Sequence, residues 1–100
     1  MIKILVVGGV AIDTIVRNGK RCEVAGGAGV YTALAAVACG AEVSLLALRP
    51  EPLPLVLMSF ASRLSSWQGP PIPERELSHF EIGLDADLPS FRVVNMGPEE

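Results

Sequence analysis

Basic side chains are few in this sequence and do not cluster. It contains eight Lys and Arg residues against eleven Asp and Glu, which gives a formal net charge of −3 for 100 residues. A protein that binds a nucleic-acid backbone needs a concentrated basic face, because it must neutralise closely spaced phosphates. The sequence therefore predicts no nucleic-acid partner.

Cysteine and long apolar runs are also scarce. Cys22 and Cys39 match no C-x-x-C metal or redox motif, so we expect reduced, structural thiols and no metal site. The N-terminal apolar run is too short to cross a bilayer, and no signal-peptide cleavage motif follows it. We expect a cytoplasmic protein without membrane contact.

Hydrophobic residues, in contrast, make up 50% of the chain. This share is high for so short a domain, because a small globule has proportionally more surface to cover with polar groups. Two explanations are open: part of the apolar surface meets a partner, or the chain belongs to a larger unit.

Two apolar runs predict buried parallel strands, near residues 2–9 and 42–48. The runs "IKILVVGGV" and "AEVSLLAL" are apolar on both faces, as expected for strands that are covered on both sides. Between them, residues 27–39 carry apolar side chains three to four apart among many alanines, which is typical of a closely packed helix. Strand, helix and strand together indicate a crossover of the α/β class.

Alternating apolar and polar residues predict two β-hairpins, near residues 11–24 and 79–96. An Asn-Gly pair joins the two runs of the first hairpin and is a strong turn signal. A second helix is predicted from Pro54 to Trp67, with the Trp67 ring closing its end. The proline-rich "QGPPIPE" that follows is expected to be irregular.

Three glycines, Gly26, Gly27 and Gly29, lie where the first helix begins. Glycine at a helix N-terminus lets a hydroxyl-rich or anionic ligand approach the backbone N–H groups. The other interpretation is a tight turn that packs closely. The spacing fits neither a phosphate-binding loop nor the dinucleotide fingerprint, so a dinucleotide-binding protein is disfavoured.

Asp13 follows the first predicted strand and has apolar neighbours. A carboxylate in such a place must find hydrogen-bond donors or face a cleft, because an unpaired buried charge is costly. Ligands of α/β folds bind at the carboxyl ends of the strands, which favours a binding role. The alternative is an Asp that bonds its own turn.

Taken together, "GGVAID", the first hairpin and "AGGAGVYTALAAVACGAEVSLLAL" resemble the N-terminal region of the ribokinase/PfkB carbohydrate kinase family. The resemblance covers nearly the whole chain but only about the first third of a typical member. It implies a partial ribokinase-like α/β fold, with parallel core strands, flanking helices and small β lid hairpins. Residues 1–100 would then form the N-terminal portion of a kinase domain.

The resemblance also implies roles for particular residues. Asp13 would bond the hydroxyls of a sugar or nucleoside, Gly26 and Gly27 would let backbone N–H groups approach it, and Gly9 would line the pocket floor. Tyr31 stands where the family usually has Asn, so the identity of the substrate is open. For Tyr31 the other interpretation is a packed aromatic with its hydroxyl at the surface.

No part of the chain matches the Gly-Ala-Gly-Asp helix start that carries the catalytic Asp of this family. Asp85 and Asp87 lie in a predicted hairpin turn and are not assigned this role. Family members use ATP with Mg²⁺, but we expect neither to bind this chain alone. We predict an N-terminal kinase fragment with part of the sugar site, no catalytic residue and no activity of its own.

A second hypothesis assigns the chain no catalytic role. The chain would be a non-catalytic interaction module that pairs through exposed β-strand edges, and a homodimer through the lid strands would be one form of it.

Overall fold

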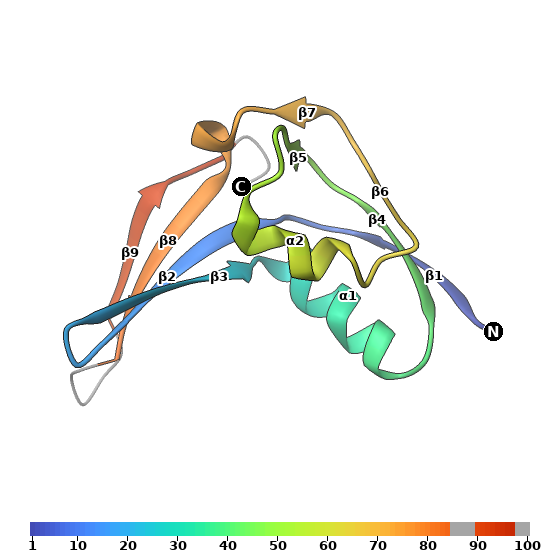
Figure 1. Ribbon diagram of the computed structural model, residues 1–100, viewed down its shortest axis with the longest axis horizontal. Coiled ribbons are helices and arrows are strands. Elements are labelled where there is room, and N and C mark those ends of the chain that lie inside the picture. The colour runs from blue at the N-terminus through green and yellow to red at the C-terminus, as the bar shows by residue number, and fades with distance from the viewer. Residues whose placement is uncertain (85–89, 98–100) are drawn as a thin grey trace.

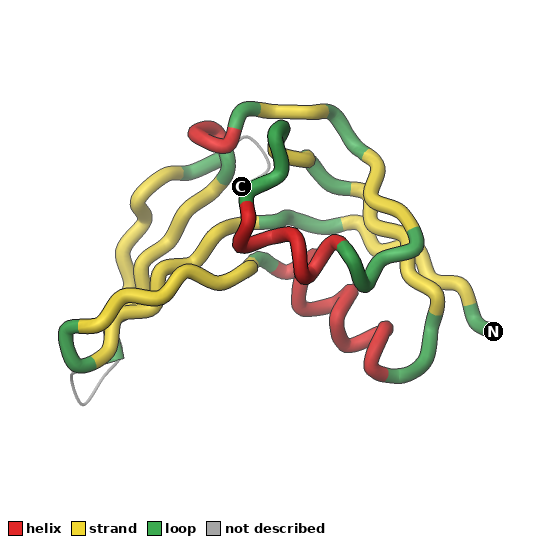
Figure 2. The backbone as a smooth tube through the Cα atoms, viewed as in Figure 1, coloured by secondary structure: helices red, strands yellow, loops and turns green. Residues whose placement is uncertain are grey.

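The computed structural model describes residues 1–84 and 90–97. Within them the chain forms three β-sheets and two α-helices, arranged as an arch with the N-terminus at one foot (Figure 1, Figure 2). The helices are α1 (Ala28–Ala38), α2 (Leu55–Ala61) and the short 3-10 helix η1 (Glu74–Glu76). The strands are β1 (Lys3–Val7), β2 (Ala11–Arg17), β3 (Lys20–Gly26), β4 (Glu42–Leu46), β5 (Arg49–Pro50), β6 (Ser66–Gln68), β7 (Pro71–Ile72), β8 (Ser78–Gly83) and β9 (Ser90–Asn95).

The core sheet consists of three parallel strands in the order β1-β4-β6. Its register aligns Val6 with Leu45 and Leu45 with Trp67, and all three side chains are buried. The inward side chains of β1 and β4 are β-branched or aliphatic, and each is worth about 1.5–3 kcal/mol when fully buried. These parallel strands with flanking helices confirm the predicted α/β class.

Both helices lie beneath the arch and pack on one face of the core sheet (Figure 1). Val30 and Ala33 of α1 join Leu57 and Phe60 of α2 in the buried cluster. α1 approaches the sheet closely because its buried face carries only Gly, Ala and Val. Among the residues described, no helix has the length and hydropathy of a membrane span.

A four-stranded sheet in the order β3-β2-β8-β9 forms the other foot of the arch (Figure 1). β2 is antiparallel to β3 and β8 to β9, so each pair is a hairpin, while β2 and β8 run parallel and join the hairpins into one sheet. The connection between β8 and β9, with Asp85 and Asp87, lies outside the described residues. We call this the lid sheet.

The segment after Pro54 differs from the sequence prediction. α2 ends at Ala61 rather than near Trp67, and Trp67 lies in β6, where it extends the core sheet. Its indole Nε1 donates to the Ala47 carbonyl at 3.3 Å, and its ring packs edge-on against Phe60 with centroids 5.7 Å apart. These contacts bury a large ring and satisfy its N–H group, which accounts for the place of Trp67 in the sheet.

The proline-rich segment is also more regular than predicted. β7 pairs in parallel with β5, although both strands contain a proline. The hydrogen bonds come from residues beside the prolines: Arg49 N donates to Pro70 O at 3.1 Å, and Glu51 N donates to Ile72 O at 2.8 Å. A two-residue parallel pair of this kind tolerates proline, since the missing N–H groups are not needed for the pairing.

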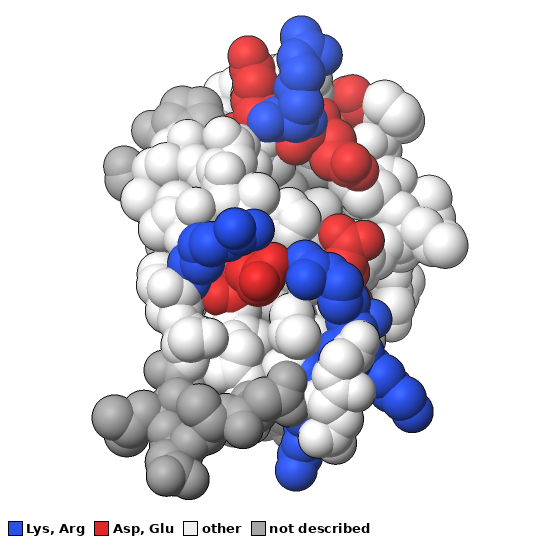
Figure 3. All heavy atoms as spheres, turned by 90° about the vertical axis from the view of Figure 1, so that its left-hand side faces the viewer, with Lys and Arg blue, Asp and Glu red and all other residues white. Residues whose placement is uncertain are grey.

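Charged side chains of both signs are mixed over the end of the molecule that the lid sheet forms (Figure 3). Glu81 on β8 accepts from Arg21 of β3 at 2.7 Å and pairs with Arg92 of β9 at 3.4 Å. The hydrogen bond from Arg21 is the main cause that lowers the pKa of Glu81 below its ordinary value of 4.5. The ion pairs therefore link strands from both hairpins.

Replacing Glu81 with Gln is expected to change the pH dependence of stability. Because its pKa is lower in the folded chain, the carboxylate stabilises the fold above the ordinary pKa, and this contribution is lost as the pH falls through the lowered value. Urea unfolding from neutral to strongly acidic pH should show the parent chain more stable than Glu81→Gln at neutral pH, with the two converging in acid. Glu76→Gln, an exposed glutamate on η1, is the control and should keep the parent profile. A difference between Glu81→Gln and the parent that does not depend on pH would contradict this.

Candidate functional site

The first turn of α1 is built on glycine. Gly27 precedes the helix with φ 96° and ψ 153°, and no side chain caps the N-terminus. Its carbonyl accepts a hydrogen bond from Tyr31 N at 3.2 Å, which closes the first turn. The positive φ explains why glycine occupies this position, since other residues adopt it only with strain.

The link between β1 and β2 packs directly against this turn. Gly29 N donates to Gly9 O at 2.8 Å, which satisfies one of the N–H groups that a helix start leaves free. A β-carbon placed on Gly27 would lie 2.6 Å from Gly9 O, and one on Gly29 would lie 2.8 Å from the Gly8 carbonyl. Close packing, one of the two interpretations of the glycine-rich run, is therefore seen at Gly27 and Gly29.

Gly26 has a different neighbour, the carboxylate of Asp13. A β-carbon on Gly26 would lie 2.5 Å from Asp13 Cγ and would overlap Oδ2. The β2–β3 register pairs Ala11 with Gly26, so Asp13 lies two residues along on the same face of the sheet. Asp13 is only 6% exposed and lies within β2, not in a turn. The structure thus brings Asp13, Gly26 and the start of α1 together.

Tyr31 extends from the first turn of α1 to the same carboxylate. Its hydroxyl donates to Asp13 Oδ2 at 3.4 Å, while the side chain as a whole is 57% exposed. Partial burial first, and then the charge and hydrogen bond of Asp13, raise the pKa of Tyr31. The phenol therefore stays neutral at physiological pH and acts as a donor beside a carboxylate acceptor. Neither this exposure nor this contact is that of a packed core aromatic.

A stacked aromatic pair lies on the same face of the lid sheet and was not found by sequence reasoning. Phe80 is the β8 partner of Asp13, and its ring stacks on Phe91 of β9 with centroids 5.4 Å apart and an angle of 25°. Phe91 is 65% exposed. The alternation of apolar and polar residues along β8 and β9 indicated which side chains share a face. Only the parallel pairing of β2 with β8, however, places the rings beside Asp13.

His79 lies on the opposite face of the lid sheet. Its register partner is Ile12, and its Nε2 is 2.7 Å from Thr14 Oγ1, so the ring is held away from Asp13. Since alternate residues of a strand point to opposite faces, His79 cannot join Asp13 in one site.

Solved structures with the same fold include sugar kinases. The fructokinase of Xylella fastidiosa with bound ATP superposes with a TM-score of 0.77 at 21% identity, over 95% of this chain and 31% of that chain. A ribokinase of Cryptococcus neoformans in complex with ADP gives 0.67 at 22% identity, over 93% and 34%. A PfkB protein from a Polaromonas species gives 0.75 at 13% identity, over 99% and 37%.

The chain has part of the fold of ribokinase-like sugar kinases. It spans about a third of the length of the solved structures that it matches. No model of a known protein family matches the sequence, and no curated protein is similar enough to be counted as a relative. The likeness therefore concerns the fold, and it confirms the ribokinase-like architecture inferred from the sequence.

The described part of this ribokinase-like chain offers no ligand set for the Mg²⁺ that accompanies ATP. Among residues 1–84 and 90–97, no group of three or more His, Cys, Asp or Glu side chains could hold a metal ion. At the glycine-rich start of α1, Gly29 N already donates to Gly9 O. We therefore derive no chemical step through the nucleotide or the metal.

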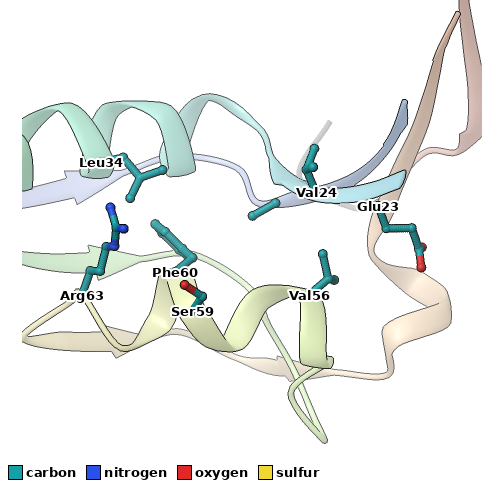
Figure 4. A pocket seen from close by; sticks show the side chains of 8 residues that line it. Glu23, Val24, Leu34, Val56, Ser59, Phe60 and Arg63 are labelled. Carbon is teal, nitrogen blue, oxygen red and sulfur yellow. The ribbon is translucent and has the colours of Figure 1, made fainter. Parts of the chain in front are cut away.

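A cavity of about 360 Å³ lies elsewhere in the ribokinase-like chain, between α1, α2 and β3 (Figure 4). Leu34, Val56 and Phe60 supply apolar walls, and Arg63 points across it toward Leu34 (Figure 4). Neither Asp13 nor Tyr31 lines it. This cavity is thus separate from the group around Asp13.

Gly27→Ala and Gly40→Ala form a matched pair for testing the contact between α1 and the β1–β2 link. Both glycines have left-handed φ, 96° and 88°, but a β-carbon on Gly40 meets nothing within 4 Å. The positive φ costs about 1–2 kcal/mol at Gly40. At Gly27, where ψ is 153°, the backbone lies in a region nearly exclusive to glycine, and the cost is about 1–3 kcal/mol. Crowding against Gly9 O adds about 1–3 kcal/mol at Gly27 alone. Urea denaturation should therefore show a larger loss for Gly27→Ala, and equal losses would contradict the close packing.

Proposed function

We propose that this chain is the N-terminal part of an ATP-dependent kinase of sugars or nucleosides and that it carries part of the substrate site. The observation that carries the proposal is the buried Asp13 carboxylate beside Gly26 and the start of α1. It occurs in a fold that the chain shares with solved sugar kinases. Carboxyl ends of strands followed by helix N-termini are the usual places for ligands in α/β folds.

The chemistry of this group suits a polyhydroxylated ligand. Asp13 supplies a charged acceptor for substrate hydroxyls, and the neutral Tyr31 phenol supplies a donor 3.4 Å from it. Gly26 carries no side chain that would displace the Asp13 carboxylate, and Gly27 lies against the Gly9 carbonyl. A neutral sugar is favoured over a phosphate, because the nearest charge is negative.

The stacked pair of Phe80 and Phe91 supports the same role. Sugars and nucleosides combine hydroxyl edges with an apolar or aromatic face, and a pocket for them combines a few polar groups with apolar walls. The rings lie on the Asp13 face of the lid sheet. In this proposal Asp13 and Tyr31 bind the hydroxyls, and the phenylalanines cover the ring of the substrate.

Phosphoryl transfer needs further groups, which position the nucleophile and stabilise charge on the phosphate. We assign these groups, and the sites of ATP and Mg²⁺, to the remaining two thirds of the kinase. The complete kinase would act in the cytoplasm, where ATP is supplied.

Amide NMR of the 100-residue chain, titrated with pentoses, hexoses and nucleosides, tests the proposal. We expect shifts that concentrate on Gly26, Gly27 and Tyr31 for at least one ligand class. Tetrahydropyran, a ring without hydroxyls, should cause none of them. The Asp13→Asn variant should lose these shifts, since the charged acceptor is removed while the side chain keeps its size.

Glu23→Gln is the matched control for this titration. Glu23 lies on the adjacent strand but aligns with Thr14, on the opposite face of the sheet, so its loss should leave the shifts intact. Shifts that survive in Asp13→Asn, or that no ligand produces in the parent chain, would contradict the proposed site.

The isolated chain is expected to show no kinase turnover. An assay of ADP release with the same ligands should stay at the level of the blank, because the groups that stabilise the transferred phosphate belong to the rest of the kinase. Turnover clearly above the blank would show that the chain holds a complete active centre. It would refute the proposal that the active site is shared between this chain and the rest of the kinase.

One feature favours the second hypothesis, a non-catalytic interaction module. β9 is an edge strand whose Phe91, Val93 and Val94 are exposed, and such an edge can pair with a strand of another chain. A homodimer through the lid strands would use this edge. A stable dimer in sedimentation, combined with no ligand-dependent shift, would favour the module over the kinase fragment.

A further inference from the structure

The cavity between α1, α2 and β3 combines apolar walls with a charged residue at each end. Leu34 of α1 and Val56 and Phe60 of α2 form its walls, and Arg63 extends into it from just beyond the end of α2 (Figure 4). Its volume of about 360 Å³ falls at the lower end of the range in which proteins bind small molecules. The cavity is therefore large enough to hold a small ligand.

A regular spacing along α2 and the turn that follows builds one wall of this cavity. Val56, Phe60 and Arg63 recur three to four residues apart, so they lie on one side of the helix. Arg63 N donates to Phe60 O at 3.0 Å, which continues the turn beyond Ala61. Since the Phe60 ring is packed in the core and only 4% exposed, the backbone that carries Arg63 is held in place at this end of the cavity.

The Arg63 guanidinium has no internal partner in the part of the chain that the structure describes. It forms neither an ion pair nor a side-chain hydrogen bond there, whereas Arg21, Arg49 and Arg92 each pair with a glutamate. A guanidinium presents five N–H donors in a rigid planar fork, which matches the two oxygens of a carboxylate. Arg63 is thus available to an anionic group of a ligand.

Glu23 of β3 lies at the end of the cavity opposite Arg63 (Figure 4). Apart from Ser59, the described residues that line the space between these two charges are apolar. The Glu23 carboxylate repels a second negative charge at its own end of a ligand. The charges therefore favour a ligand that carries one carboxylate, at the Arg63 end, on an otherwise apolar body.

Other classes of small molecule match the cavity less well. A free sugar has hydroxyl groups over most of its surface, and the apolar walls would leave many of them without hydrogen-bond partners. Inorganic phosphate would meet a single guanidinium and would lose part of its hydration to the same walls. A neutral apolar molecule would cover the walls but would leave the Arg63 donors unused.

We propose that this cavity is a binding site for a small monocarboxylate with an apolar body. Arg63 binds the carboxylate through two parallel N–H···O hydrogen bonds. The body of the ligand lies along Leu34, Val56 and Phe60. The site is independent of the proposed kinase function, because neither Asp13 nor Tyr31 lines it.

Amide NMR of the 100-residue chain with octanoate as the probe tests this site at neutral pH. We expect shifts that concentrate on Leu34, Ser59 and Arg63 and that saturate with a Kd of about 1–10 mM, as suits a ligand with so few atoms. Acetate has the same charge without the apolar body, and octylammonium has the same body with the opposite charge. At equal concentration, each should cause less than about a third of these shifts, because the site needs both features.

Two variants and a control locate the bound carboxylate. Arg63→Gln should weaken octanoate binding about three- to tenfold, a moderate factor because the guanidinium is exposed to water. Arg17→Gln removes an exposed arginine of β2 that does not line the cavity, and it should keep the affinity of the parent. Ser59→Phe places a ring in the cavity at an exposed helical position, so it should abolish the shift at Leu34 while leaving the circular dichroism spectrum unchanged.

Three results would overturn the inference. Shifts from octylammonium as large as those from octanoate would show that only apolar contact is read. An unchanged affinity in Arg63→Gln would remove the carboxylate from the guanidinium. Octanoate shifts that are absent from Leu34 and Ser59, or that persist at Leu34 in Ser59→Phe, would show that this cavity is not the site.

Discussion

A contact between two glycine-rich backbone segments holds the junction of the core sheet and the lid sheet together. The link between β1 and β2 lies against the first turn of α1, with Gly9 O bonded to Gly29 N at 2.8 Å. Side chains on Gly8 or Gly29 would meet backbone atoms at 3.0 Å or less, so the two segments touch because both lack them. Since β1 belongs to the core sheet and β2 to the lid sheet, this contact determines where one sheet stands relative to the other.

The same contact changes how the glycine-rich run is understood. Close packing accounts for two of the three glycines, and the third has a different neighbour. Gly27 and Gly29 fit against the β1–β2 link, while Gly26 leaves room for the Asp13 carboxylate. A helix start that already holds a carbonyl and lies near a carboxylate is poorly suited to an anion.

Sequence patterns were sufficient for the elements that are long and locally encoded. The apolar runs of β1 and β4, the Ala-rich α1 and the α/β class were predictable, because periodicity over several residues specifies them. β6 could not be predicted, because three residues are too few to show a periodic pattern of apolar side chains. Trp67 was instead assigned to the end of a helix. The proline-containing pair of β5 and β7 was missed for the same reason.

The residues of the candidate site were likewise predictable only in part. Asp13 and the glycines were predicted from their place after a buried strand and before a helix. Phe80 and Phe91 were not, because only the parallel pairing of β2 with β8 brings them to the Asp13 face. That pairing joins segments far apart in the chain, and neither segment contains a sign of its partner.

The position of β2 in the centre of its sheet has a consequence for how the chain folds. Its hairpin with β3 closes over a short turn, but its contact with β8 joins Thr14 to His79 across 65 positions of sequence. Closing so long a loop costs conformational entropy before the contacts that offset this cost have formed. The topology therefore has a high contact order, and its last strands are expected to form slowly. During synthesis the first hairpin can form early, while the face that carries Asp13 is completed only after β8 has arrived.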